Sequence, residues 1–250
     1  MNKLIKVCVA GFFMLATLST KAQSAAQQLP AFNKIISSPH VSLVLVEGDQ
    51  EGVRLQYEHI APEKVNVSVR HKTLHIYLDD ARITVKNQKW QEGNQTYKRP
   101  IYDRKVKVIA YVTYKQLNEL QVRGEEVVTC QSSLVSDAFR LRVYGQATVN
   151  LAGLTTKKLK AKLYGENKVT IQSGRATKQR YRIYGENRLN TENLTGEIVS
   201  AHSYGESHLS VYASDRIGVT AFGESDIRFA GGAHLRKGLV IGEVTIHRAD

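Results

Sequence analysis

The sequence predicts an all-β protein: a parallel β-helix, or β-solenoid, of about seven glycine-centred rungs, with an N-terminal antiparallel β region that caps it. Three observations lead to this prediction. A unit of about 20 residues recurs through the second half of the chain, apolar residues alternate within each unit, and the first half has strand-like segments without the glycine repeat. Such a repeat is typical of a solenoid, in which each unit buries its apolar side against its neighbours.

The repeat consists of seven segments that align on a glycine. Successive glycines are 21, 20, 20, 20, 18 and 19 residues apart. At roughly 3.3 Å per strand residue, one unit closes one rung, and rungs stack about 4.8 Å apart, so equivalent residues become neighbours in space. The segments are VRGEEVVTC at Gly124, VYGQATVNL at Gly145, LYGENKVTI at Gly165, IYGENRLNT at Gly185, SYGESHLSV at Gly205, AFGESDIRF at Gly223 and VIGEVTIHR at Gly242.

The alternation indicates which side chains of each rung point inward. We expect one inward row two residues before the glycine and another four residues after it. Between them, two residues after the glycine, we expect a buried, hydrogen-bonded polar ladder of Asn167, Asn187, Ser207 and Ser225. The two rows are Val122, Val143, Leu163, Ile183, Ser203, Ala221 and Val240, and Val128, Val149, Val169, Leu189, Leu209, Ile227 and Ile246.

The outward rows place like residues above one another, in the order basic, aromatic, acidic and basic. The aromatic row, directly before the glycine, is Tyr144, Tyr164, Tyr184, Tyr204 and Phe222. The row directly after it is Glu125, Gln146, Glu166, Glu186, Glu206, Glu224 and Glu243, whose mutual repulsion calls for neighbouring cations. The flanking basic residues are Arg140, Arg142, Lys160, Lys162, Arg180 and Arg182 on one side and Lys168, Arg188 and His208 on the other.

Two interpretations of this face stay open. Tyrosine stacking and salt bridges between rungs would by themselves stabilise an exposed sheet. Alternatively, the face is a ligand groove in which tyrosine rings stack on sugars while basic side chains hold carboxylates, sulfates or phosphates. The candidate ligand-binding residues are Tyr144, Tyr164, Tyr184, Tyr204, Arg142, Lys162 and Arg182.

The N-terminal half contains alternating segments between Val41 and Val112 that lack the repeat. Two of them, Val65 to Val69 and Leu74 to Leu78, are expected to form a hairpin, which suggests an antiparallel sheet. Such a sheet would cover the strand edge at the end of the solenoid. We therefore divide the chain into a signal peptide (1–22), an N-terminal β region (23–115) and the solenoid repeats (116–250).

The segment 87–103, NQKWQEGNQTYKRPIYD, interrupts the strand pattern and is expected to be a long loop. It contains Trp90 among Lys89, Lys98 and Arg99. Long loops in compact domains are commonly functional or disordered. Trp90 is therefore an eighth candidate ligand contact, with packing against the sheet as the alternative.

The first 22 residues have the features of a secretory signal peptide: Lys3 and Lys6, an apolar run from Val7 to Leu18, and a polar, small-residue end, with cleavage expected after Ala22. The run is shorter than the roughly 20 residues of a spanning helix, which disfavours a retained anchor. Because Cys8 lies within the run and not behind it, no lipid anchor is expected. The protein is predicted to be exported, either periplasmic or associated with the cell surface.

Charge and cysteine content limit the partners. The formal charge of +12 includes three lysines of the signal peptide, and the remaining excess favours anionic partners. For an exported protein this indicates a glycan or another anionic envelope polymer, not nucleic acid, although a merely solvated basic surface is an alternative. Cys130 is the only cysteine after the signal peptide, so neither an intramolecular disulfide nor a cysteine-based metal site is expected.

The order of these segments resembles the head GIN domain family of putative auto-transporter adhesins. The resemblance rests on FNKIISSPHVSLVLVEG at 32–48, the hairpin ending in LHIYL, VKVIAYVTYKQLNELQVRGEEVV at 106–128, and the later glycine-centred rungs. It implies an exported bacterial protein with an N-terminal β region and β-helical rungs, and it supplies no catalytic residues. Nothing after Ile246 resembles the strands of a membrane barrel, so self-translocation is not expected.

The sequence therefore favours a non-catalytic binding or adhesin-like module that contacts a glycan or anionic envelope polymer. The alternatives are a polysaccharide lyase or hydrolase on a β-helix scaffold and a structural component of an envelope assembly. No catalytic residue, metal ligand or cofactor is predicted, because the charged residues form rows and do not converge as a general acid and base would. Calcium is disfavoured because single carboxylates per rung supply too few oxygens.

Overall fold

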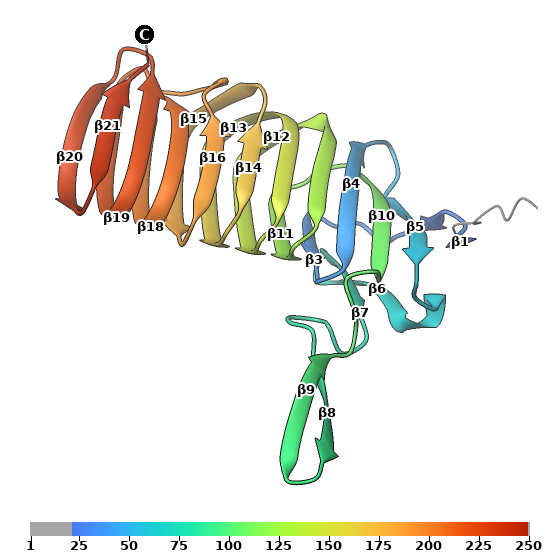
Figure 1. The fold of residues 1–250 in the computed structure, drawn as a ribbon. Coiled ribbons are helices and arrows are strands. Elements are labelled where there is room, and N and C mark those ends of the chain that lie inside the picture. The colour runs from blue at the N-terminus through green and yellow to red at the C-terminus, as the bar shows by residue number, and fades with distance from the viewer. Residues whose placement is uncertain (1–21, 250) are drawn as a thin grey trace, which may run out of the picture.

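The computed structural model describes residues 22–249, and it is an elongated β-solenoid of stacked parallel strands (Figure 1). Apart from Ala22, the predicted signal peptide lies outside the described residues. The fold class predicted from the sequence is confirmed, with 71% strand and about six solenoid turns. The part of the chain that the structure describes has one short 3-10 helix (Pro62–Lys64) and no helix long and apolar enough to cross a membrane.

The repeat units pair in parallel with equivalent residues in register. Gly124 lies beside Gly145, Gly145 beside Gly165, and Tyr144 beside Tyr164. The strands of this region are β11 (Glu119–Gly124), β12 (Val127–Gly145), β13 (Thr148–Gly165), β14 (Lys168–Ile171), β15 (Gly174–Tyr184), β16 (Asn187–Thr191), β17 (Leu194–Thr195), β18 (Ile198–Tyr212), β19 (Arg216–Ala230), β20 (His234–Ile241) and β21 (Val244–Arg248).

Each repeat glycine forms a corner of a rung, and two constraints favour glycine there. The seven φ angles lie between +97° and +112°, a region that side chains with a Cβ rarely adopt. The corners also stack directly, so that a Cβ at Gly165 would come 2.2 Å from the carbonyl oxygen of Gly145. The repeat in the sequence therefore follows from a backbone conformation that recurs in every rung.

The two predicted inward rows line a continuous core, and only their last members, Val240 and Ile246 in the final rung, are half-buried. The polar ladder is also confirmed. Asn167 Nδ2 donates to Asn187 Oδ1 at 3.0 Å, and Asn187 Nδ2 donates to the Gly165 and Tyr184 carbonyls at 3.1 Å each. The ladder thereby satisfies the backbone at corners that the solenoid buries.

The N-terminal region contributes both a cap and further rungs. The predicted hairpin is formed by β6 (Val65–Arg70) and β7 (Thr73–Leu78), and β5 (Gly52–Glu58) runs antiparallel to β10 (Lys107–Tyr114). Two short strands, β1 (Ala22–Gln23) and β2 (Gln27–Gln28), pair with β5. These antiparallel strands cap the solenoid as expected.

Four strands of the same region belong to the parallel ladder, which the sequence did not indicate. The strand β3 (Lys34–Ser37) lies between β7 and β11, and β4 (Val41–Glu47) lies between β10 and β12. A rung from the start of the chain is thus inserted between rungs that come later. Because these neighbours are not consecutive in the chain, they have no constant spacing and leave no repeat in the sequence.

The expectation of a long loop at 87–103 was wrong. The segment forms a two-stranded hairpin of β8 (Asn87–Glu92) and β9 (Gln95–Pro100), which projects away from the solenoid (Figure 1). Its two-residue turn, Gly93-Asn94, has Gly93 at φ +61°, in agreement with the preference of tight hairpins for glycine at positive φ. All twelve strand residues of the hairpin are exposed.

Candidate functional site

The aromatic row is an almost parallel stack along the solenoid axis. Ring centroids from Tyr144 through Tyr164, Tyr184 and Tyr204 to Phe222 are 5.0, 4.9, 5.0 and 5.2 Å apart, with interplanar angles of 2° to 6°. The faces of the interior rings are therefore covered by neighbouring rings. Each interior tyrosine presents to a ligand its edge and hydroxyl group, and at the Tyr144 end of the stack one ring face has no tyrosine neighbour.

Two columns of basic side chains run parallel to this stack on the same outward face. Arg142, Lys162 and Arg182 are paired in register two residues before the tyrosines, and His202 continues that column. Arg140, Lys160 and Arg180 form the second column. We call the surface formed by the four tyrosines and these six basic residues the basic–tyrosine face.

Among the described residues, ion pairs to the basic–tyrosine face occur only at one end of it. Glu119 forms ion pairs with Arg142, at 2.7 Å from Nη1 to Oε1, and with Arg140, at 3.5 Å from Nη1 to Oε2. Within residues 22–249, no carboxylate forms an ion pair with Lys160, Lys162, Arg180 or Arg182. The central part of the face therefore keeps four uncompensated positive charges, three on exposed residues and one on the half-buried Lys162.

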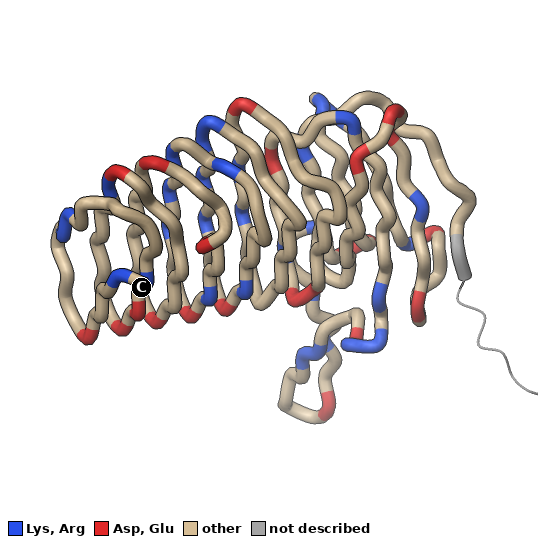
Figure 2. The backbone as a smooth tube through the Cα atoms, turned by 90° about the horizontal axis from the view of Figure 1, so that it is seen from above, with Lys and Arg blue, Asp and Glu red and all other residues tan. Residues whose placement is uncertain are grey.

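The acidic row follows the glycine corners along one edge of the solenoid (Figure 2). The expected neutralisation by basic side chains is absent: in the described chain none of these glutamates forms an ion pair, and Glu166 accepts a hydrogen bond from Gln146 at 3.1 Å. The carboxylates are exposed, so water and salt screen their repulsion. Among the described residues no three potential ligands converge on a metal position.

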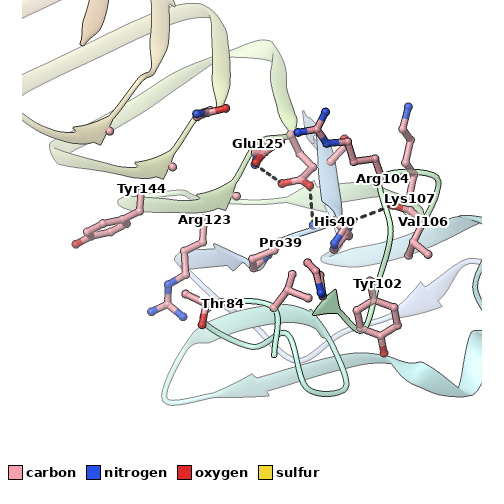
Figure 3. A pocket seen from close by; sticks show the side chains of 18 of the residues that line it. Pro39, His40, Thr84, Tyr102, Arg104, Val106, Lys107, Arg123, Glu125 and Tyr144 are labelled. Atoms are coloured by element: carbon pink, nitrogen blue, oxygen red, sulfur yellow. Dashed lines mark hydrogen bonds between the residues drawn. The ribbon is translucent and has the colours of Figure 1, made fainter. Parts of the chain in front are cut away.

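A cleft of about 1230 Å³ opens where the solenoid meets the N-terminal region (Figure 3). Its walls come from the β3–β4 corner at Pro39 and His40, the loops that flank the β8–β9 hairpin, the Gly124 corner and the Tyr144 end of the aromatic stack. Apolar groups of Ile83, Val85 and Val127 line it, and Arg104, Lys107 and Arg123 bring positive charge. The cleft was not predicted from the sequence.

Glu126 links the two sides of the cleft by hydrogen bonds. Its Oε1 accepts a hydrogen bond from the His40 backbone N–H at 2.7 Å, and Oε2 accepts one from the Glu125 N–H at 2.8 Å. Burial raises the pKa of the Glu126 carboxyl, while these hydrogen bonds oppose the shift. Glu126 lies two residues after Gly124, the position that asparagine takes in the polar ladder. Its carboxylate accepts a backbone N–H at the corner of the inserted rung, just as Asn167 Oδ1 accepts the Ala147 N–H at 3.1 Å.

The eight candidate residues divide into two groups. The structure brings Tyr144, Tyr164, Tyr184, Tyr204, Arg142, Lys162 and Arg182 together on the basic–tyrosine face. Trp90 lies elsewhere, on the projecting hairpin, where its ring stacks on Tyr97 with centroids 5.5 Å apart. The hairpin pairing, not the solenoid sheet, holds this half-exposed ring.

Sequence reasoning missed two residues of the cleft, although the repeat alignment contained a signal for both. Arg123 stands where the next four units have tyrosine, and Glu126 stands where the third to sixth units have asparagine or serine. Both departures occur in the first unit. The last unit departs at the same two positions, with Ile241 and Val244, so such departures mark the ends of the regular repeat.

The model of the putative auto-transporter adhesin, head GIN domain family matches residues 31–233. The chain belongs to this family. Solved structures with the same fold include a putative adhesin from Bacteroides fragilis at 18% identity and a TM-score of 0.72, which covers 93% of this chain and 98% of its own. A putative adhesin from Parabacteroides distasonis has 17% identity and a TM-score of 0.66, with coverage of 92% and 98%.

The head GIN domain fold also occurs in a protein named a putative lipid binding protein, from Parabacteroides distasonis. It has 13% identity and a TM-score of 0.60, and the alignment covers 93% of this chain and 98% of that one. At these identities the similarity shows the fold alone. Among curated proteins, none matches this sequence.

Proposed function

We propose that this head GIN domain protein is an exported, non-catalytic binding module that contacts an anionic glycan or a similar envelope polymer through the basic–tyrosine face. The observation that carries the proposal is the set of Lys160, Lys162, Arg180 and Arg182, which lie in register on successive rungs and have no carboxylate partner in the described chain. Export and a location in the periplasm or at the cell surface, without a lipid anchor, are part of the proposal. The adhesin names of the family and its structural neighbours support the binding role.

The spacing of the face suits a linear polymer. Equivalent residues recur at every rung, so the face repeats the same cation and hydroxyl arrangement about every 4.8 Å along the solenoid axis. An extended anionic chain parallel to this axis would meet a basic side chain at each step. The tyrosine hydroxyls beside the basic columns can donate and accept hydrogen bonds with sugar hydroxyl groups.

The stacking of the rings limits how the tyrosines can contact a sugar. A sugar cannot lie on the face of Tyr164 or Tyr184 without separating rings that are about 5 Å apart. In the proposed complex these tyrosines therefore contribute edges and hydroxyls, and the basic columns contribute most of the affinity. Charge attraction across such an exposed surface depends on salt, so binding should weaken as ionic strength rises.

The test is retention of the mature protein on immobilised polygalacturonate, with neutral dextran as the comparison surface. Replacing Lys160, Lys162 and Arg182 with glutamine should abolish most of the retention on polygalacturonate. A matched triple variant at Lys64, Arg70 and Lys115, three exposed cations outside the face, removes the same charge and should retain binding. Equal losses in the two variants would show that net charge alone attracts the polymer and would refute the proposed face.

A further inference from the structure

The tyrosine stack ends in the cleft, and its terminal ring face differs from all the others. The ring of Tyr144 lies parallel to Tyr164 within 2°, so its second face points along the solenoid axis towards the rung that carries Arg123. Tyr144 and Arg123 both line the cleft (Figure 3). At the opposite end of the stack, Phe222 is followed in register by Ile241.

Arg123 is held in place by neutral acceptors. Its Nη1 donates to the carbonyl oxygen of Arg82 at 3.0 Å. With the Gln121 amide turned so that its oxygen faces the guanidinium, the orientation that satisfies both groups, this oxygen accepts from Nε at 2.8 Å and from Nη2 at 2.7 Å. These bonds use three of the five N–H groups of a guanidinium. One N–H remains on each terminal nitrogen, the arrangement that a carboxylate can accept from as a bidentate pair.

The surroundings of Arg123 are positive and partly desolvated. Burial, together with the nearby Arg82, lowers the pKa of the Arg123 guanidinium. His75 lies close enough to both arginines for their charges to lower its own pKa. Within residues 22–249, no carboxylate forms an ion pair with Arg123 or Arg82. A half-buried cation beside a second one is unfavourable until an anion joins it.

From this arrangement we infer that the cleft contains a subsite for a single acidic sugar unit, whose ring lies against the face of Tyr144 that has no aromatic neighbour and whose carboxylate pairs with Arg123. The inference deepens the proposed function, because the subsite would hold one uronic acid unit of a polymer that continues along the basic–tyrosine face. The ligand class follows from the pair of groups: an aromatic face accepts the apolar face of a sugar ring, and a guanidinium fork accepts a carboxylate.

The two nearby acidic groups restrict how such a ligand sits. Glu126 has its oxygens committed to the His40 and Glu125 backbone N–H groups, and Glu125 belongs to the acidic row beyond the Gly124 corner. A ligand carboxylate turned towards that corner would meet like charge. The acidic row therefore favours the orientation in which the carboxylate faces Arg123 and the uncharged sugar edge faces the corner.

The inference is tested with D-galacturonate, neutral D-galactose and inorganic phosphate as probes in solution NMR of the mature protein. Galacturonate should shift the Arg123 Nε–H resonance and receive saturation from the Tyr144 ring, while galactose should bind about tenfold more weakly. Phosphate that shifts Arg123 as strongly as galacturonate would show an anion site without a sugar-ring contact and would overturn the inference.

Variants separate the subsite from general charge attraction. Arg123→Lys keeps the charge but removes the fork, and Tyr144→Ala removes the ring face; each should weaken galacturonate binding about tenfold. Arg70→Lys, the matched change at an exposed arginine outside both the cleft and the basic–tyrosine face, should leave monosaccharide binding unchanged. If galacturonate does not shift Arg123 while polygalacturonate retention still depends on Lys160, Lys162 and Arg182, the subsite is refuted and the proposed function stands.

Discussion

The repeat region and the N-terminal region build the same ladder from two kinds of sequence. In the repeat, consecutive units become consecutive rungs, so Gly145, Gly165 and Gly185 stack in chain order. In the N-terminal region, β3 and β4 form a rung between strands that come later in the chain. In both regions the strands stack in parallel, and side chains form hydrogen bonds with the backbone groups at the corners. The difference is that only consecutive rungs leave a period in the sequence.

The largest expected effect tests the corner conformation shared by the repeat rungs. Gly165→Ala places a Cβ 2.2 Å from the Gly145 carbonyl oxygen at a φ of +107°. We expect a loss of about 3 to 4 kcal/mol in the free energy of unfolding, measured by chemical denaturation. Gly218→Ala is the control, because its Cβ would meet only one atom, at 4.0 Å, and its φ is not in the strained range. Equal effects of the two changes would show that the corners impose no special constraint.

The next effect tests the polar ladder inside the repeat. Asn187→Ala removes the acceptor of the Asn167 N–H and side chain and leaves the Gly165 and Tyr184 carbonyls without that donor. Burying several unsatisfied groups should cost about 3 kcal/mol of unfolding free energy. The exposed Asn190, whose side chain accepts only the Glu192 N–H, is the matched site, where alanine should cost about 0.5 kcal/mol. A loss below 1 kcal/mol at Asn187 would contradict a structural role for the ladder.

The third prediction concerns the inserted rung. Ser38 Oγ donates to the Arg82 carbonyl at 2.7 Å, so it accepts from His75 Nε2 at 3.1 Å, which places the proton of the neutral His75 ring on Nε2. Burial, followed by the charges of Arg82 and Arg123, lowers the pKa of His75 from 6.5 to about 4. Because the unfolded state binds the proton more tightly, stability is complete above pH 6.5 and falls as the pH drops towards 4.

Between pH 7 and pH 4.5 this linkage should remove about 2 kcal/mol of unfolding free energy. The measurement compares wild type with His75→Gln, in which this part of the pH dependence should disappear. An unchanged slope in the variant would contradict the assignment.

The smallest expected effect on stability is that of removing the tyrosine hydroxyls while the stack stays intact, a change that distinguishes stacking from ligand contact on the basic–tyrosine face. Changing Tyr164, Tyr184 and Tyr204 to phenylalanine preserves the stack, so unfolding free energy should change by less than about 0.5 kcal/mol. Changing the same residues to leucine removes the ring contacts and should cost about 0.5 to 1.5 kcal/mol per ring pair. Polygalacturonate retention should fall in the phenylalanine variant if the hydroxyls contact the polymer. A destabilised phenylalanine variant would show that the hydroxyls serve the fold.

A feature could be predicted from the sequence where residues that are neighbours in space recur at equal spacing along the chain. The corner glycines, the inward rows and the tyrosine row were predictable because each recurs about every 20 residues. The contact between Glu126 and His40 joins residues 86 apart and has no counterpart at a fixed period. The cleft depends on that contact and on the β8–β9 hairpin. The sequence of this hairpin predicts a loop, because all its strand residues are exposed and none marks an inward face.

The orientation of the tyrosine rings could not be predicted from the repeat pattern either. The repeat places Tyr144, Tyr164 and Tyr184 in one row, but only the rotamers decide whether their faces meet a ligand or one another. In the structure the ring planes differ by about 2° and cover each other. We therefore expect sugar stacking only at the face of Tyr144 that has no aromatic neighbour, and not along the whole row.

The most direct test of the proposed binding surface is a residue-by-residue NMR map on addition of a short oligogalacturonate. Binding through the basic–tyrosine face predicts that the shifted resonances belong to Arg142, Lys162, Arg182 and the adjoining tyrosines, and that they extend to Arg123 at the cleft. Resonances of Trp90 and the projecting hairpin should stay in place. Shifts confined to the hairpin, or spread evenly over all exposed cations, would contradict the proposal that this face binds the polymer.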